Sequence, residues 1–243
     1  MTERFPNYTP PISPDLRNQY ESALANEFRW KNGFLFSDRE ESDLDHVDSM
    51  LRIHDEVSYK YPFFFSEVDG EDVSHMIYIH DAGEILAHDL SHSVPNYDTI
   101  RTRWKRRERA AFRLLTRDHI DDIELRAYVR GLYKRYEEKR PDDKQAHYVQ
   151  LIDKLQAVRF GAANVFPARK LRMQAERLSQ VNHIYGLIIK PSQSLFPLLS
   201  EGAQDELLKF TDIELLTLRV NGYRASEVDP YRNLVNQELV RLR

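Results

Sequence analysis

Apolar residues recur at helical spacing through almost the whole chain after residue 14, and this periodicity restricts the fold more than any other feature of the sequence. Apolar side chains at positions i, i+3, i+4 and i+7 line one face of a helix, whereas a half-buried strand alternates at every second residue. Few segments alternate in that way, and the 243 residues include eight glycines. The sequence therefore predicts an essentially all-α fold, long enough to bury a core.

Prolines mark the breaks between the predicted helices. Pro62, Pro95, Pro141 and Pro167 interrupt the periodic pattern, because proline lacks a backbone N–H and clashes with the preceding turn. The helices predicted before residue 190 cover residues 15–30, 43–60, 71–87, 98–116, 121–139, 143–160 and 165–188.

The same pattern suggests how the chain divides. Residues 1–14 contain four prolines and are predicted to form an extended arm. We expect the main helical domain at 15–188. After "KPSQSLFP" (190–197) the helical pattern resumes in two further segments, so residues 189–243 are expected to form a C-terminal helical extension.

The composition is typical of a soluble globular protein. Hydrophobic residues make up 41% and charged residues 30%, and the formal net charge is −4. Because the chain has no cysteine, disulfides, cysteine-bound metal clusters and cysteine nucleophiles are excluded, and a reducing cytoplasmic location is expected. No signal peptide and no apolar run of about 18 residues is found, so we expect no membrane association. The mildly acidic total argues against an extended nucleic acid as a partner.

The stretch "IYIHDAGEILAHDLSHS" (77–93) places titratable groups inside an apolar helical pattern. On a continuous helix, His80, Asp81 and Glu84 would share roughly one face. A carboxylate buried there without a partner costs several kcal/mol or takes up a proton, and a divalent cation removes that cost. The alternative is a solvated pair on a helix surface. The apolar residues that favour burial are Met76, Ile77, Ile79, Ile85 and Leu86.

Two other predicted helices carry similar anomalies. In "REESDLDHVDSML", Ser42 and Asp45 form a box-like helix start, and His46 follows on the apolar stripe. In "HYVQLIDKLQAVRF", Asp153 interrupts a strongly apolar helix. A second His-Asp pair, in "RIHDEVSYKYP", has polar neighbours on both sides, so we interpret His54 as part of a solvated helix face.

The order His, His-Asp, Asp resembles the metal-binding signature of HD-domain phosphohydrolases, and most closely that of the 5′-deoxynucleotidase branch. The motifs that carry this resemblance read "ESDLDH" (41–46), "HDAGEILAHDL" (80–90) and "LIDKL" (151–155). The resemblance covers about residues 25 to 165. One position departs from the family pattern, because His88 stands where the family has a glycine.

The resemblance implies an HD-domain helical bundle and a hydrolase that removes phosphate from (deoxy)nucleoside 5′-monophosphates. It implies one divalent metal ion, such as Mn²⁺, Co²⁺ or Mg²⁺, and a small-molecule nucleotide substrate. Glu84 and Asp89 match the family's catalytic acids. In "FRWKNG", Arg29 and Trp30 match a pair near the substrate phosphate and sugar, although ordinary core packing also explains the tryptophan. The ligands that it implies are His46, His80, Asp81 and Asp153.

Three alternatives stay open. A dinuclear centre would need two more histidines, but His88 and His92 follow the His-Asp pair more closely than that pattern requires. The basic stretch 101–109 is either a solvated helix face or a surface that reaches toward a polyphosphate, which would favour a deoxynucleoside triphosphate triphosphohydrolase. In the third alternative the site is degenerate and the chain is an interaction scaffold, whose C-terminal helices contact a partner or build a homo-oligomer.

Overall fold

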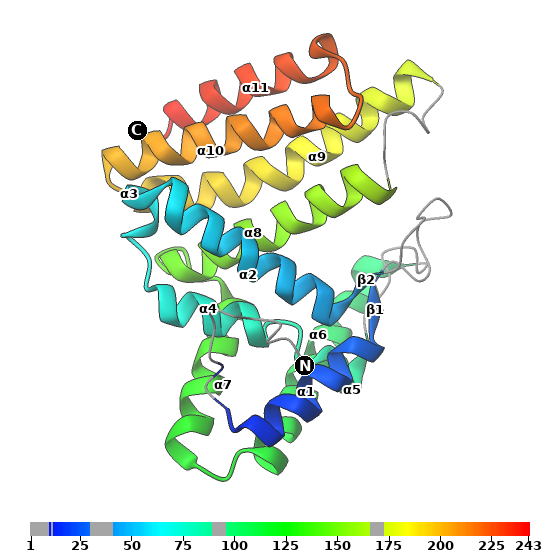
Figure 1. Ribbon diagram of the computed structural model, residues 1–243, viewed down its shortest axis with the longest axis vertical. Coiled ribbons are helices and arrows are strands. Elements are labelled where there is room, and N and C mark those ends of the chain that lie inside the picture. The colour runs from blue at the N-terminus through cyan, green and yellow to red at the C-terminus, as the bar shows by residue number, and fades with distance from the viewer. Residues whose placement is uncertain (1–9, 11, 30–40, 89–95, 166–172) are drawn as a thin grey trace. The chain divides into compact units, whose positions relative to one another are not determined.

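Helices account for most of this computed structural model, which describes residues 10, 12–29, 41–88, 96–165 and 173–243 (Figure 1). The all-α prediction is confirmed. One pair of very short strands accompanies the helices: β1 (Phe28–Arg29) and β2 (Glu41–Ser42) are antiparallel. The chain forms two compact units. We call residues 1–51 with 74–138 unit 1, and residues 52–73 with 139–243 unit 2.

Unit 1 contains the pair of strands and the helical segments that lie within residues 12–51 and 74–138. Its first helix begins at Pro14, where the hydroxyl of Ser13 accepts a hydrogen bond from the Leu16 N–H. The phenol of Tyr20 donates to the carbonyl oxygen of Tyr78 at 2.6 Å. This bond fixes the first helix against the helix that ends at Ile79. The helices are α1 (Pro14–Asn26), the first half of α2 (Asp43–Lys60), most of α4 (Gly70–Ile79), α5 (Glu84–Ala87), α6 (Tyr97–His119) and α7 (Ile123–Glu138).

Unit 2 contains the remaining helices, and α9, α10 and α11 pack together as a group (Figure 1). Its core is aromatic: the rings of Phe64 and Tyr148 lie 5.4 Å apart, and Phe210 packs against Phe64. The elements are α3 (Pro62–Phe65), α8 (Lys144–Phe160), the π-helical turn Gly161–Val165, α9 (Gln174–Leu195), the 3-10 turn Phe196–Leu198, α10 (Glu201–Val220) and α11 (Ala225–Val240).

Two predicted helix boundaries are wrong for physical reasons. The helix predicted at 71–87 is interrupted, because α4 ends at Ile79 and α5 begins at Glu84. The break predicted at 190–197 is absent, because α9 continues through Pro191 to Leu195. An internal proline costs about 3 kcal/mol. Burial of Leu195 and Phe196, which are fully inaccessible, offsets that cost at roughly 1.5–3 kcal/mol for each side chain.

The interpretation of His54 as a solvated residue is also wrong. The side chain is buried in unit 2, and its Nδ1 lies 3.1 Å from the hydroxyl of Tyr148. Burial lowers the pKa of His54 to about 4, although the charge of Asp55 works in the opposite direction. The neighbour Asp55 is exposed, as the polar pattern predicted.

None of the helices in the described part of the chain combines the length and the hydropathy that crossing a bilayer requires.

Candidate metal centre

The start of α2 fixes the position of His46. The backbone N–H of Asp45 donates to the hydroxyl of Ser42 at 3.1 Å, and that hydroxyl donates to the Asp45 carboxylate at 2.8 Å. These reciprocal bonds confirm the box-like helix start that the sequence predicted. The helix therefore begins at Asp43 and places His46 in its first turns, with no exposed surface.

A turn, and not a continuous helix, presents the His-Asp pair. Residues 80–83 form turns between α4 and α5, and the Glu84 N–H donates to the carbonyl oxygen of Asp81. In the ring of His80, Nδ1 lies 2.7 Å from the carbonyl oxygen of Ile77. A carbonyl oxygen accepts only, so Nδ1 carries the hydrogen and Nε2 of a neutral ring keeps its lone pair. This arrangement is typical of a histidine that binds a metal through Nε2.

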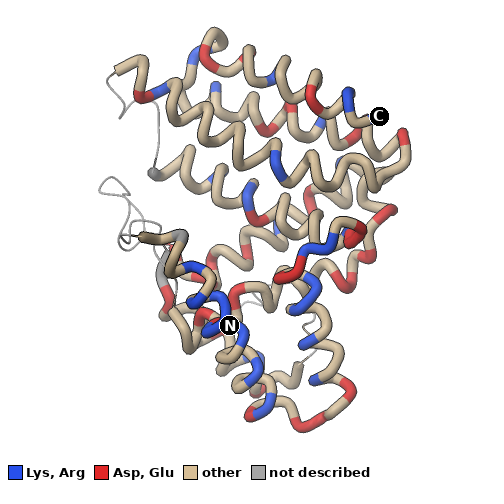
Figure 2. The backbone as a smooth tube through the Cα atoms, turned by 180° about the vertical axis from the view of Figure 1, so that it is seen from behind, with Lys and Arg blue, Asp and Glu red and all other residues tan. Residues whose placement is uncertain are grey.

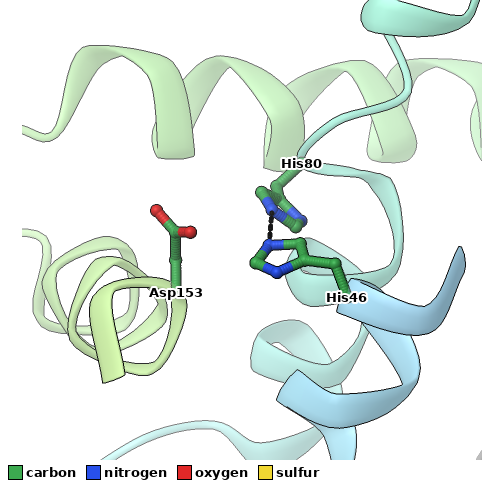
Figure 3. Close-up of side chains that lie close together, drawn as sticks. All are labelled: His46, His80 and Asp153. Atoms are coloured by element: carbon green, nitrogen blue, oxygen red, sulfur yellow. Dashed lines mark hydrogen bonds between the residues drawn. The ribbon is translucent and has the colours of Figure 1, made fainter. Parts of the chain in front are cut away.

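Three ligand-type atoms converge within unit 1. The Nε2 atoms of His46 and His80 lie 3.3 Å apart, as the dashed line in Figure 3 marks. The Oδ2 atom of Asp81 lies 2.9 Å from Nε2 of His80 and 3.7 Å from Nε2 of His46. Both histidine side chains are at most 1% exposed, so few water molecules can reach these atoms.

This triangle fits a divalent metal ion. Bonds of about 2.1 Å at octahedral or tetrahedral angles place neighbouring ligand atoms roughly 3.0 to 3.4 Å apart. The separations above lie near that range. A lone pair on Nε2 of His80 facing a carboxylate oxygen at 2.9 Å also needs a cation between the two atoms, either a proton or a metal ion. Imidazole and carboxylate ligands together suit transition-metal ions.

Two further carboxylates gather beside Asp81. Each of Asp43, Asp81 and Glu84 offers an oxygen within 4.8 Å of the others. Asp43 is 1% exposed and Glu84 is 8% exposed. The sequence identified Glu84 as a site residue but missed Asp43, whose position in the first turn of α2, three residues before His46, was the available signal.

Asp153 belongs to unit 2, where it lies on α8. It is 5% exposed, and its neighbours Ile152 and Leu155 are completely buried. Its Oδ2 atom accepts a hydrogen bond from the adjacent Lys154 ammonium at 2.8 Å. The predicted acid on an apolar helix is therefore a buried carboxylate.

Helix α6 packs against the turn formed by residues 80–83. A Cβ atom on Gly83 would lie 2.7 Å from the carbonyl oxygen of Glu108, so α6 approaches this backbone too closely for a larger residue. The indole N–H of Trp104 donates to the carbonyl oxygen of His88 at 2.8 Å. The side chains of Lys105 and Glu108 form an ion pair.

Lys105 also contacts an acidic residue of α7, so charged side chains lie between α6 and α7. The ammonium of Lys105 lies 3.6 Å from the carboxylate of Glu137. Burial works to lower the pKa of Lys105, but the charges of Glu137 and Glu108 outweigh it and raise that pKa. Burial raises the pKa of the Glu108 carboxyl, and the ammonium opposes that shift. Sequence reasoning missed this group, because a charge on an amphipathic helix does not reveal what faces it.

The arginines of the basic stretch lie apart from this buried side of α6. Arg103, Arg106 and Arg107 are exposed, and Figure 2 marks the Lys and Arg residues of the chain in blue. The guanidinium of Arg107 lies 4.9 Å from the centre of the Trp104 ring. Trp104, Lys105 and Glu108 face the stretch from Gly83 to His88, so those three arginines are on the solvent side of the helix.

The remaining predicted residues are described only in part. The backbone of Arg29 pairs with Glu41 in the two-stranded pair, which places it beside the chain that enters α2. Trp30 and Asp89 lie outside the described residues. The position where the family has glycine adopts a backbone that glycine favours: His88 has φ 61° and ψ 158°. Its ring pairs with the carboxylate of Glu27 at 2.8 Å.

Comparison with known proteins agrees with this architecture. A family model for the HD domain matches residues 25–187. The crystal structure of a predicted metal-dependent phosphohydrolase from Magnetospirillum magnetotacticum MS-1 is similar, with a TM-score of 0.55 and 18% sequence identity. The match covers 86% of this chain and 96% of that one. Among curated proteins, none matches the sequence.

Proposed function

This chain belongs to the HD-domain family, and we propose that it is a metal-dependent phosphohydrolase that acts on (deoxy)nucleoside 5′-monophosphates. The observation that carries this proposal is the buried triangle of His46, His80 and Asp81, whose atoms are spaced as ligands of one ion. The predicted metal-dependent phosphohydrolase with a similar fold supports the reaction class. The nucleotide substrate rests on the resemblance of the three motifs to the 5′-deoxynucleotidase branch.

The proposed ligands are the three residues of the triangle and Asp153. We include Asp153 because it matches the family motif and because its carboxylate is buried on an apolar helix. A bound Mn²⁺, Co²⁺ or Mg²⁺ would supply a nucleophilic water near neutral pH and neutralise charge on the phosphate. Four protein ligands on a six-coordinate ion leave positions for water and substrate.

The other residues are proposed to act on the substrate and the water. Glu84 begins α5 beside Asp81, so its carboxylate is placed to orient the attacking water and hold its proton. We assign Asp89 to the same task. Arg29 would bind the non-bridging oxygens of the phosphate through its paired donors, and Trp30 would contact the sugar. The products would be a nucleoside and inorganic phosphate.

The test is release of phosphate from ribo- and deoxynucleoside mono- and triphosphates, after chelation and re-addition of Mn²⁺, Co²⁺ or Mg²⁺. The variant is Asp81→Asn, and the matched control is Asp55→Asn, which alters the exposed acid of the second His-Asp pair. We expect orthophosphate from monophosphates, lost in the first variant and kept in the second. Tripolyphosphate would identify a triphosphohydrolase instead. If no substrate is hydrolysed and no metal is bound, the chain is better described as an interaction scaffold.

A further inference from the structure

Unit 1 contains a cavity behind the turn that carries the His-Asp pair, and the cavity is partly open to solvent. Its volume is about 240 Å³, and it is lined by α1, by residues 79–85, by α6 and by α7. All of these elements belong to one compact unit. Nothing in the proposed reaction uses this space.

The walls of the cavity are almost entirely apolar. Most of the lining residues are aliphatic, such as Ala23, or aromatic, such as Phe112. Tyr20 and Thr116 also line it, and their hydroxyls donate to the carbonyl oxygens of Tyr78 at 2.6 Å and Phe112 at 3.0 Å. Their hydrogen-bonding capacity is therefore largely used. An apolar cavity of this kind holds water poorly and takes an apolar guest instead.

Two exposed polar residues, Gln19 and His119, also line the cavity. Within the described residues, neither side chain makes a hydrogen bond. Because they are exposed while most of the lining is covered, they mark the side where a ligand meets solvent. A ligand with an apolar body and one polar end matches this distribution.

The volume indicates how much of that body the cavity can hold. An apolar cavity of about 150 Å³ holds benzene, with its six carbon atoms. In proportion, 240 Å³ accommodates roughly ten carbon atoms at the same density. A nucleobase is small enough, but its several polar edge atoms would be left without partners against these walls, which is costly.

We propose that this cavity binds an unbranched hydrocarbon chain of about ten carbon atoms, whose single polar end lies at Gln19 and His119. The class includes medium-chain fatty acids and alcohols. Binding does not rest on the proposed phosphohydrolase reaction, because no ligand or substrate residue of that site lines the cavity.

The position of the cavity gives the ligand a regulatory consequence. Ile79, Ala82 and Ile85 line it, and they alternate along the chain with His80, Asp81 and Glu84. The segment 79–85 therefore presents its apolar side chains to the cavity, whereas its candidate site residues do not line the cavity. A bound chain would support that segment from behind and stabilise the arrangement of the metal-binding atoms.

The experiment is isothermal titration calorimetry of the full chain with decanoate and, separately, 1-nonanol, which distinguishes an anionic from a neutral polar end. Ala23→Leu fills part of the cavity from α1. Ala110→Leu is the matched control, because Ala110 is exposed on α6 and does not line the cavity. We expect one ligand per chain, with binding at least tenfold weaker in the first variant and unchanged in the second.

Equal binding by the two variants would overturn the proposal, because the ligand would then lie elsewhere. So would the absence of binding by the unmodified chain. A series from hexanoate to tetradecanoate gives a test that needs no variant: the proposal expects the tightest binding near ten carbons. Affinity that keeps rising to the longest chain indicates nonspecific adsorption and would reject it.

Discussion

The imidazole of His80 donates from Nδ1 to the carbonyl oxygen of Ile77, so its Nε2 lone pair is directed at the site that it shares with His46. The hydrogen bond sets the tautomer before any ion arrives, and the ring does not need to reorient on binding. The T-shaped contact between this ring and Tyr136 holds it from a second direction.

Removal of metal is expected to destabilise the folded chain. A ligand that binds only the folded state stabilises it by about 4 kcal/mol when its concentration is a thousand times its dissociation constant. Chelation should therefore lower the melting temperature measured by circular dichroism, and added Mn²⁺ should restore it. Asp81→Asn should lose the Mn²⁺ response and Asp55→Asn should keep it. An equal response in both variants would argue against the assigned ligands.

Gly83 is expected to tolerate no side chain. A Cβ atom there would lie 2.7 Å from the Glu108 carbonyl oxygen and 2.8 Å from the Tyr133 hydroxyl, so α6 would have to move. We predict that Gly83→Ala lowers the free energy of unfolding by about 1–3 kcal/mol in urea titrations. Gly131→Ala is the control, because a Cβ atom on that helical glycine meets nothing within 4 Å and should stabilise α7 by up to about 1 kcal/mol.

Replacing His88 by glycine is expected to stabilise the chain. Its backbone, at φ 61° and ψ 158°, lies in a region that costs a non-glycine residue about 1–3 kcal/mol. The ion pair with Glu27 offsets little, because the imidazole is 65% exposed. We predict that His88→Gly raises the free energy of unfolding by about 1 kcal/mol, after the greater freedom of glycine in the unfolded chain is subtracted. His88→Ala keeps the backbone strain and should give no increase; if both variants behave alike, strain is not the cause.

The pH dependence of stability should report the burial of His54. Its pKa is about 4 in the folded chain and 6.5 in the unfolded chain, so between these values the unfolded state binds the extra proton. Stability is therefore fully present above pH 6.5 and falls as the pH drops toward 4, by at most about 3 kcal/mol from this residue. Urea titrations from pH 7 to 4 should show a smaller loss for His54→Gln. A variant with the same slope as the unmodified chain would contradict the assignment.

Local signals in the sequence predicted local structure well. The reciprocal bonds of Ser42 and Asp45 define the start of α2 at the predicted residue, because a helix cap depends on neighbours along the chain. The anomalous acid Asp153 is buried on its helix, as an apolar flank indicates. The placement of Asp43 could also have been inferred, because residues three apart on a helix are neighbours.

Features that depend on distant partners were not predictable in this way. His54 is buried because Tyr148 lies against it, 94 residues away in the sequence. The turn at 80–83 lies where α6 approaches Gly83. The hydrophobic periodicity of residues 71–87 gives no sign of that contact. Pro191 remains helical because buried residues flank it, so tertiary packing overrides a strong local preference.

The division of the chain into units limits how the protein can be cut into fragments. Each unit is built from two separate stretches of sequence. Two of the three exchanges between the units fall within α2 and α4, and the third follows the end of α7. A contiguous segment that contains all of unit 1 includes residues 52–73 of unit 2, and one that contains all of unit 2 includes residues 74–138 of unit 1. A fragment that ends at residue 188 would also divide α9 before its buried Leu195. Domain dissection by one proteolytic cut should therefore release unstable pieces, and the intact polypeptide is the unit to express.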